Sequence, residues 1–158
     1  MKKLLQVLFI VGLSACSGSD EPKGDIYTID GVAIGGFDLV SYFEQGEALH
    51  GTLDQKSIYN EATYYFANAK NKTLFDANPE KYLPAYGGWC AYAVAENSIK
   101  MEPDPTLWKI QDGRLLLFYS DWLTPITGKL SDAWNENEKE NLVKADRNWE
   151  NIKSQKAQ

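Results

Sequence analysis

The N-terminus separates a short targeting segment from the part of the chain that folds. Lys2 and Lys3 give it a basic start, and an apolar stretch follows over residues 4–13. This stretch is shorter than the roughly 20 residues that a helix needs to span a bilayer, and it has the layout of a signal peptide. It ends in an aliphatic residue, two small residues and a cysteine, Leu13-Ser14-Ala15-Cys16. We therefore exclude residues 1–15 from the fold.

This ending resembles the lipobox of bacterial lipoproteins, in which the cysteine becomes the lipidated first residue. The resemblance implies that Cys16 carries a diacylglyceryl thioether and an N-acyl chain, and more than one chain anchors stably where a single chain is marginal. Residues 16–25 then form the lipidated N-terminus and a small, polar tether. Ser17 after the cysteine resembles the outer-membrane sorting pattern of Gram-negative envelopes. We expect a protein of the bacterial cell envelope that is anchored to a lipid bilayer, in the outer membrane, and faces the periplasm. The alternative is an ordinary secretory peptide with an incidental cysteine.

Charge and composition define the class of the remaining chain. The 158 residues carry a formal net charge of −6, and no run of Lys or Arg follows Lys3. Such a surface cannot neutralise a row of phosphates, which argues against nucleic-acid binding. Hydrophobic residues make up 44% of the sequence and aromatic residues 13%. This is the composition of a globular domain with a ring-rich core rather than of a disordered segment.

Turn and capping signals predict the first elements of the domain. Weak alternation around Asp30-Gly31 indicates either a short hairpin or two strand fragments over residues 26–34. Asp38 is placed to cap a helix that Gly46 would end. We therefore expect a strand pair followed directly by a short helix.

A second hairpin and a second helix are predicted next. Two β-prone runs within residues 55–66 flank a three-residue connection, Asn60-Glu61-Ala62. Asn68 then caps a helix that stops at residues 78–79, because the residue before a proline resists helical dihedrals.

The second half of the chain contains the strongest hairpin signal. Two apolar runs within residues 107–119 bracket Asp112-Gly113. Asn135, with Glu138 three residues later, has the pattern of a capping box at the start of a final helix. One face of this helix would carry Leu142, Ala145, Trp149 and Ile152. The sequence thus predicts an α+β fold, a single small domain over residues 26–153 with short antiparallel strands or hairpins, about three helices including the C-terminal one, and a tail over 154–158.

The densest group of chemically notable residues surrounds Cys90. With Cys16 occupied by lipid, Cys90 has no disulfide partner in a compartment where thiols usually pair. Its neighbours Trp89 and Tyr92 are aromatic, and two preceding glycines permit unusual backbone dihedrals. The loop either presents the thiol to a ligand or redox partner, or packs it as a small buried hydrophobe. Residues 82–96 supply no cation to lower the thiol pKa, which favours the buried alternative.

Two further candidates are distant from Cys90 in the sequence. His50, the only histidine, has no neighbouring acid or Cys, so we expect it at the surface, and a Cys-His pair with Cys90 in space stays open. Asp38 either rims a pocket or serves as a helix cap. One His and one free Cys cannot form a blue-copper or structural zinc site. We predict no metal or other cofactor, although a copper site from Cys90, Met101 and His50 stays open because these ligands suit Cu(I).

Five stretches follow one another in order over residues 26–150. They are GVAIGGFDLVSYF at 31–43, ATYYFA at 62–67, NPEKY at 78–82, YGGWCAYAVA at 86–95, and Asp104-Pro105 before Trp108. The series resembles the YHS-domain proteins of the longer, secreted type, which are linked through their short relatives to copper transport. The short metal-linked form has three cysteines in stretches that correspond here to DLVSYF (38–43) and YYFANAKN (64–71), which contain none. The resemblance therefore implies that the fold is kept and the soft-metal site is not.

Together these features favour a membrane-anchored, YHS-like binding or accessory domain without catalytic activity, for an unknown small molecule or envelope protein. The sequence has neither the nucleophile turn of a Ser-His-Asp hydrolase nor a Gly-rich phosphate loop. The alternative is a thiol-dependent redox or copper-handling protein that uses Cys90. The candidate ligand or redox residues are Cys90, Trp89, Tyr92, Asp38 and His50.

Overall fold

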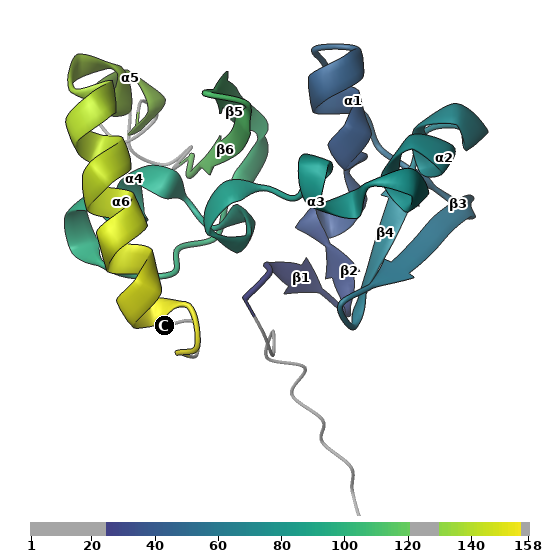
Figure 1. Ribbon diagram of the computed structural model, residues 1–158, viewed down its shortest axis with the longest axis horizontal. Coiled ribbons are helices and arrows are strands. Elements are labelled where there is room, and N and C mark those ends of the chain that lie inside the picture. The colour runs from purple at the N-terminus through teal and green to yellow at the C-terminus, as the bar shows by residue number, and fades with distance from the viewer. Residues whose placement is uncertain (1–24, 121–129, 156–158) are drawn as a thin grey trace, which may run out of the picture.

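Two small sheets, one in each half of the chain, organise the fold. The computed structural model describes residues 25–120 and 130–155. One sheet has the order β1 (Thr28–Ile29), β2 (Val32–Ala33), β4 (Ala62–Phe66) and β3 (Thr52–Tyr59). The other pairs β5 (Asp104–Gln111) with β6 (Arg114–Phe118). Figure 1 shows helices packed around both sheets. The predicted α+β class is confirmed.

Two of the predicted hairpins have the predicted turns. Asp30 and Gly31 join β1 to β2 with φ values of 50° and 77°. Asp112 and Gly113 join β5 to β6 with φ values of 51° and 74°. Two consecutive positive φ angles give a turn whose twist matches that of the flanking strands, and Asp-Gly adopts it readily.

The hairpin of β3 and β4 differs from the prediction at its turn. Only Asn60 and Glu61 connect the strands, with φ values of 45° and 66°, and Ala62 already pairs with Tyr59 in the sheet. The three-residue connection was therefore wrong, because a two-residue turn keeps Ala62 on the buried face of β4. The sheet also contains a parallel pairing of β2 with β4, which the sequence did not indicate.

The predicted caps of the first two helices are confirmed. Asp38 caps α1 (Leu39–Glu44) and Asn68 caps α2 (Ala69–Ala77), each with its side-chain oxygen on backbone N–H groups of the first turn. Asn78 ends α2, and α3 (Pro79–Tyr82) begins with the proline at its first position, where the missing N–H costs least.

The C-terminal helices depart from the prediction. The described residues contain six α-helices rather than about three, and the second half contributes α4 (Ala91–Asn97), α5 (Leu130–Glu136) and α6 (Glu138–Ile152). The capping box is wrong, because Asn135 lies inside α5. Asn137, whose backbone leaves the helical region, takes the N-cap position of α6 without a side-chain hydrogen bond.

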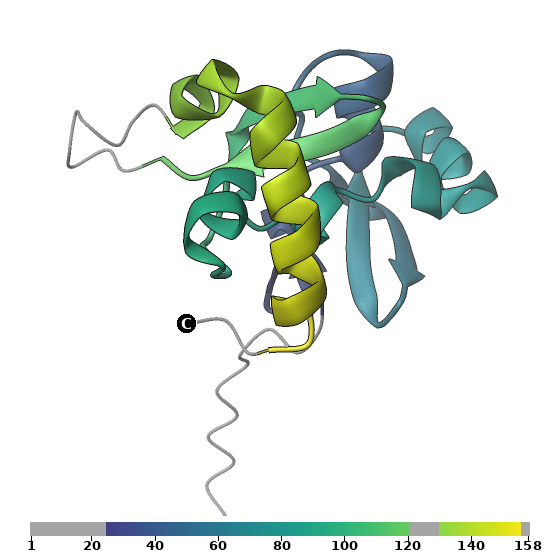
Figure 2. The same cartoon turned by 60° about the vertical axis from the view of Figure 1, so that its left-hand side comes forward.

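A continuous buried core joins the two halves. Phe66 of β4 packs on Phe75 of α2 with ring centroids 5.0 Å apart, and Phe118 of β6 packs on the Trp134 ring at 5.7 Å, all within one buried cluster. Figure 2 shows α6 crossing in front of the β5–β6 hairpin, with α4 beside it. Within residues 25–120 and 130–155 no helix has the length and apolar character that crossing a membrane requires.

Candidate functional site

Cys90 is buried in the middle of the domain. Its side chain has no solvent exposure, and it occupies the N-cap position of α4. Its backbone N–H donates to the Met101 carbonyl over 3.0 Å, and its backbone bridges to Leu117 of β6. Burial raises the pKa of the thiol, and backbone N–H groups near the sulfur act weakly in the opposite direction. The structure therefore places this residue as a core thiol, which is the buried alternative of the two that the sequence left open.

Trp89 is buried next to the thiol and packs in an aromatic environment. Its ring is 2% exposed and meets Tyr27 edge to face, with ring centroids 5.0 Å apart. The Lys100 ammonium lies 5.9 Å from the same ring and donates to two backbone carbonyls that follow α6, those of Lys153 and Gln155. Among the described residues, the indole Nε1 of Trp89 is the buried side-chain polar atom that lacks a hydrogen-bond partner. These contacts join the N-terminal strand region to the end of α6.

Asp38 connects several elements of the fold rather than lining the rim of a pocket. The residue is completely buried. One carboxylate oxygen accepts from Val40 and Ser41 at the start of α1, over 2.9 and 3.3 Å. The other accepts from the Ala67 N–H over 2.8 Å and from the Asn71 side-chain amide over 2.6 Å. The carboxylate therefore fastens α1 to the end of β4 and to α2, and the helix-cap alternative is confirmed.

His50 lies on the surface, as expected. It is exposed, its backbone bridges to Phe37, and its ring stacks on the Phe37 ring with centroids 3.9 Å apart. Cys90 is buried, and its backbone bridges to Leu117 of β6. The two side chains thus have different neighbours and different solvent access, so the structure does not support the Cys-His pair.

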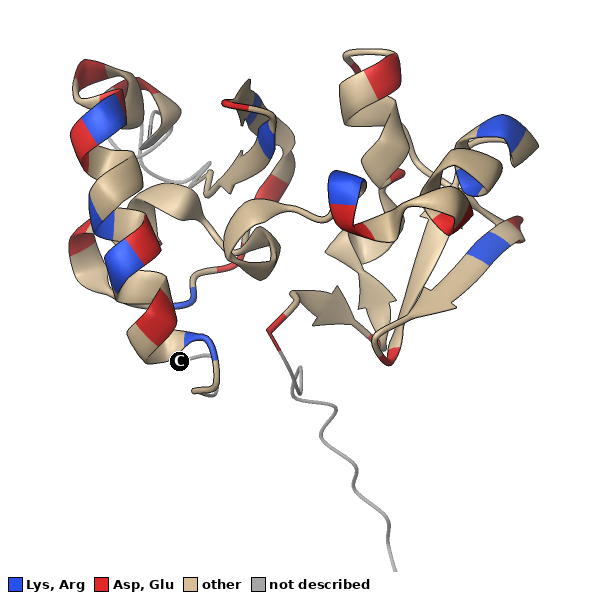
Figure 3. Ribbon diagram, viewed as in Figure 1, with Lys and Arg blue, Asp and Glu red and all other residues tan. Residues whose placement is uncertain are grey.

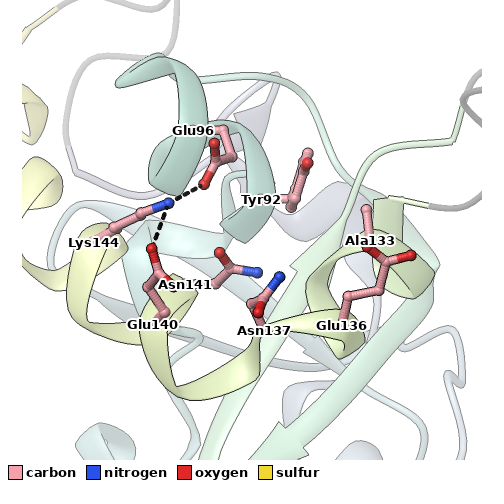
Figure 4. Close-up of a pocket in the computed structure, with 8 residues that line it drawn as sticks. All are labelled: Tyr92, Glu96, Ala133, Glu136, Asn137, Glu140, Asn141 and Lys144. Atoms are coloured by element: carbon pink, nitrogen blue, oxygen red, sulfur yellow. Dashed lines mark hydrogen bonds and ion pairs between the residues drawn. The ribbon is translucent and has the colours of Figure 1, made fainter.

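Tyr92 lines a groove. The groove has a volume of about 170 Å³ and lies among α4, α5 and α6. Figure 4 shows that it is walled by Tyr92, Glu96, Ala133, Glu136, Asn137, Glu140, Asn141 and Lys144. Sequence reasoning missed most of these residues because they come from two separate segments, and the spacing of Glu140 and Lys144 on one helix face was the only local signal.

The groove has a negative balance of charge. It contains three glutamates and one lysine, and Lys144 is held by Glu96 at 2.9 Å and by Glu140 at 3.1 Å. Hydrogen bonds to these two glutamates raise the pKa of Lys144, so its ammonium stays charged. Glu136 lies on the opposite wall (Figure 4). A groove with this surplus of carboxylates suits cationic or hydrogen-bond-donating groups better than anions.

The copper ligands considered from the sequence do not all come together: Met101 adjoins Cys90 through a backbone hydrogen bond, whereas His50 lies at the surface beside Phe37. No cluster of three or more His, Cys, Asp or Glu side chains arranged to hold a metal ion occurs in the described part of the chain. The copper site from Cys90, Met101 and His50 would need the exposed imidazole beside a fully buried sulfur. The arrangement therefore does not favour that site.

Comparisons with known proteins gave no relatives. No family model, no curated protein and no solved structure matches this chain. The resemblance to YHS-domain proteins and to bacterial lipoproteins therefore stays a prediction, and Cys16 lies outside the described residues.

Proposed function

We propose that this protein is a lipid-anchored binding or accessory domain of the bacterial envelope, of YHS-like type, that faces the periplasm and does no covalent chemistry of its own. Acylation at Cys16 would hold it on the outer membrane. Its ligand would be a small molecule or an envelope protein, and the groove beside Tyr92 is the surface that best suits contact with it.

The observation that carries this proposal is the environment of Cys90. A thiol attacks as the thiolate, and reactive cysteines occupy accessible, electropositive sites that lower the pKa. Cys90 instead has no solvent exposure, and burial raises the pKa of its thiol. The alternative function, a redox or copper-handling protein that works through this thiol, is therefore disfavoured.

Thiol labelling of the purified full chain tests this assignment. Native protein at pH 7 should react with a neutral alkylating reagent at Cys90 at least about 100-fold more slowly than the same protein unfolded in guanidinium, since burial restricts access. An added surface thiol, Thr106→Cys at an exposed position on β5, serves as the matched control and should label promptly in both states.

Two further measurements complete the test. Intact-mass analysis should find acyl groups on Cys16 in the wild-type chain and none in Cys16→Ser. Native mass spectrometry with added Cu(I) should show no stoichiometric adduct. Prompt native labelling of Cys90, or a one-to-one copper adduct lost in Cys90→Ala, would overturn the non-catalytic assignment, and an unmodified Cys16 would overturn the anchor.

A further inference from the structure

One row of side chains crosses the whole four-stranded sheet on its outer face. The register pairs Ile29 of β1 with Val32 of β2, Val32 with Thr63 of β4, and Thr63 with Ile58 of β3. Residues that pair across a sheet point to the same face. All four side chains are β-branched, so they form a continuous, stiff row from one edge of the sheet to the other.

The two ends of the row are exposed although they are apolar, and Val32 and Thr63 between them are half-buried. Ile29 is 51% exposed and Ile58 77%, and these are two of the four large hydrophobic residues exposed in the described chain. The opposite face carries Ala62 and Tyr64, both buried, and Tyr64 packs on Phe75 of α2. A sheet with one covered face normally places polar residues on the other. This sheet departs from that pattern along the row.

Two glycines lie beside the row, and the second is also close to the Tyr65 ring. A Cβ at Gly35 would lie 3.4 Å from Cδ1 of Ile29, and a Cβ at Gly36 would lie 3.8 Å from Cγ1 of Val32. Side chains at these positions would therefore cover part of the row.

We propose that the row Ile29, Val32, Thr63 and Ile58 is the surface through which the anchored domain rests on the lipid bilayer. The inference rests on the acylation of Cys16 proposed above. Eight residues, 17–24, join that cysteine to Asp25, a reach of about 30 Å when extended. Ile29 follows only four residues after Asp25. The tether thus keeps the row close to the membrane, and a high local concentration makes weak insertion sufficient.

The charges near the row indicate the type of membrane. Strands β1, β2 and β4 carry no charged residue, and the charges of this sheet lie on β3 and at the turns, as Figure 3 shows. Asp30 and Glu61 stand at the two turns, and Lys56 lies two residues from Ile58 on the same face. The surplus of carboxylates opposes an anionic surface, so contact should be stronger on zwitterionic than on anionic lipid.

A fluorescent label on the full chain in vesicles tests the contact. Lys56→Cys places a label beside the row, and Val143→Cys places one on α6, where the side chain is 68% exposed. Cys90 is buried and should not react, and where intact-mass analysis finds Cys16 unmodified, Cys16→Ser removes its competing thiol before labelling. In phosphatidylcholine vesicles with a nitroxide quencher near the headgroups, we expect the label at 56 to be quenched at least about twofold more than that at 143, because interfacial side chains sit about 5–10 Å deep. Adding anionic lipid should reduce this difference.

Matched substitutions identify the row as the contact. Ile29→Ser together with Ile58→Ser should lower quenching at position 56 to the level at 143. Leu53→Ser, at a position of β3 outside the row that is 69% exposed, should not change it. Circular dichroism confirms that each variant is folded. Equal quenching at 56 and 143, or quenching that survives the double substitution, would overturn the proposed contact.

Intact-mass analysis of the same samples separates this inference from the anchor. With Cys16 acylated and no selective quenching, the contact is wrong and the anchor stands. With Cys16 unmodified and position 56 still quenched, the contact stands and the anchor is wrong. With Cys16 unmodified and no quenching, both are wrong. Dimerisation in detergent that is lost in the double variant would assign the row to a second copy of the chain instead and overturn the bilayer proposal.

Discussion

Replacing Asp38 by Ala should destabilise the fold by about 3 to 5 kcal/mol. Loss of the helix cap accounts for about 1 kcal/mol. The Ala67 N–H and the Asn71 amide would each lose a buried acceptor, and an unsatisfied buried donor costs about 1–3 kcal/mol. The Asn71 amide keeps a second acceptor, Gln45 at 3.1 Å, so its share falls in the lower part of that range. This loss is a large fraction of the stability of a typical domain, about 5–15 kcal/mol.

Urea unfolding followed by tryptophan fluorescence measures this effect. Asp38→Asn should cost less than Asp38→Ala, about 2 kcal/mol, because the amide retains one acceptor oxygen but faces another donor with its NH₂ group. The matched control Asp54→Ala, at an exposed position of β3, should stay within about 0.5 kcal/mol of wild type.

A double-mutant cycle with Asn71→Ala isolates the contact between the two side chains. The hydrogen bond of 2.6 Å predicts a coupling energy of about 1–2 kcal/mol. A loss below about 1 kcal/mol in Asp38→Ala, or additive effects in the double variant, would refute the role of this carboxylate as the link between α1, β4 and α2.

Two further substitutions test the close approach of the N-terminal segment and an ion pair. Gly87→Ala should destabilise the fold by more than about 2 kcal/mol, because the φ of Gly87 is +59° and a Cβ there would lie 1.5 Å from the Asp25 carbonyl oxygen. The control Gly31→Ala should cost only about 1 kcal/mol, because Gly31 has a φ of +77° but open space around it. Thermal unfolding measures both. Although burial raises the pKa of Asp146, hydrogen bonds from the Arg114 guanidinium and a tyrosine hydroxyl outweigh it and hold that pKa below its usual value. This carboxylate therefore stabilises the fold above about pH 4. Its contribution disappears as the pH falls through the pKa of Asp146 in the folded protein. The difference in unfolding free energy between wild type and Asp146→Asn should therefore shrink below about pH 4. A difference that stays constant from pH 7 to pH 3 would contradict this.

Local signals predicted most of the hairpins and caps. Asp38, Asn68 and Asp112-Gly113 act on backbone groups within three or four residues, so the sequence identifies their role directly. The helices α3 and α4 were missed because four and seven residues are too few to show a helical period.

The end of one helix and the start of the next were harder to predict. Both Asn135 and Asn137 are good cap residues by type, and the capping box pattern favoured the first. The structure continues α5 past Asn135 because the helix packs through Trp134, which is fully buried and donates its indole N–H to Gln111 over 2.9 Å. Burial of one large side chain thus outweighed a local capping preference.

Local sequence signals identified the α+β class, two of the three hairpin turns, the two N-caps and the presence of one cysteine within residues 26–153. Tertiary structure decided that Cys90 is buried, that the second oxygen of Asp38 binds β4 and α2, and that Ile29 and Ile58 stand in one row on an open face. The physical reason is the range of the interactions. Capping and turn preferences act between neighbours in the chain, whereas burial and strand register depend on segments that meet only after folding.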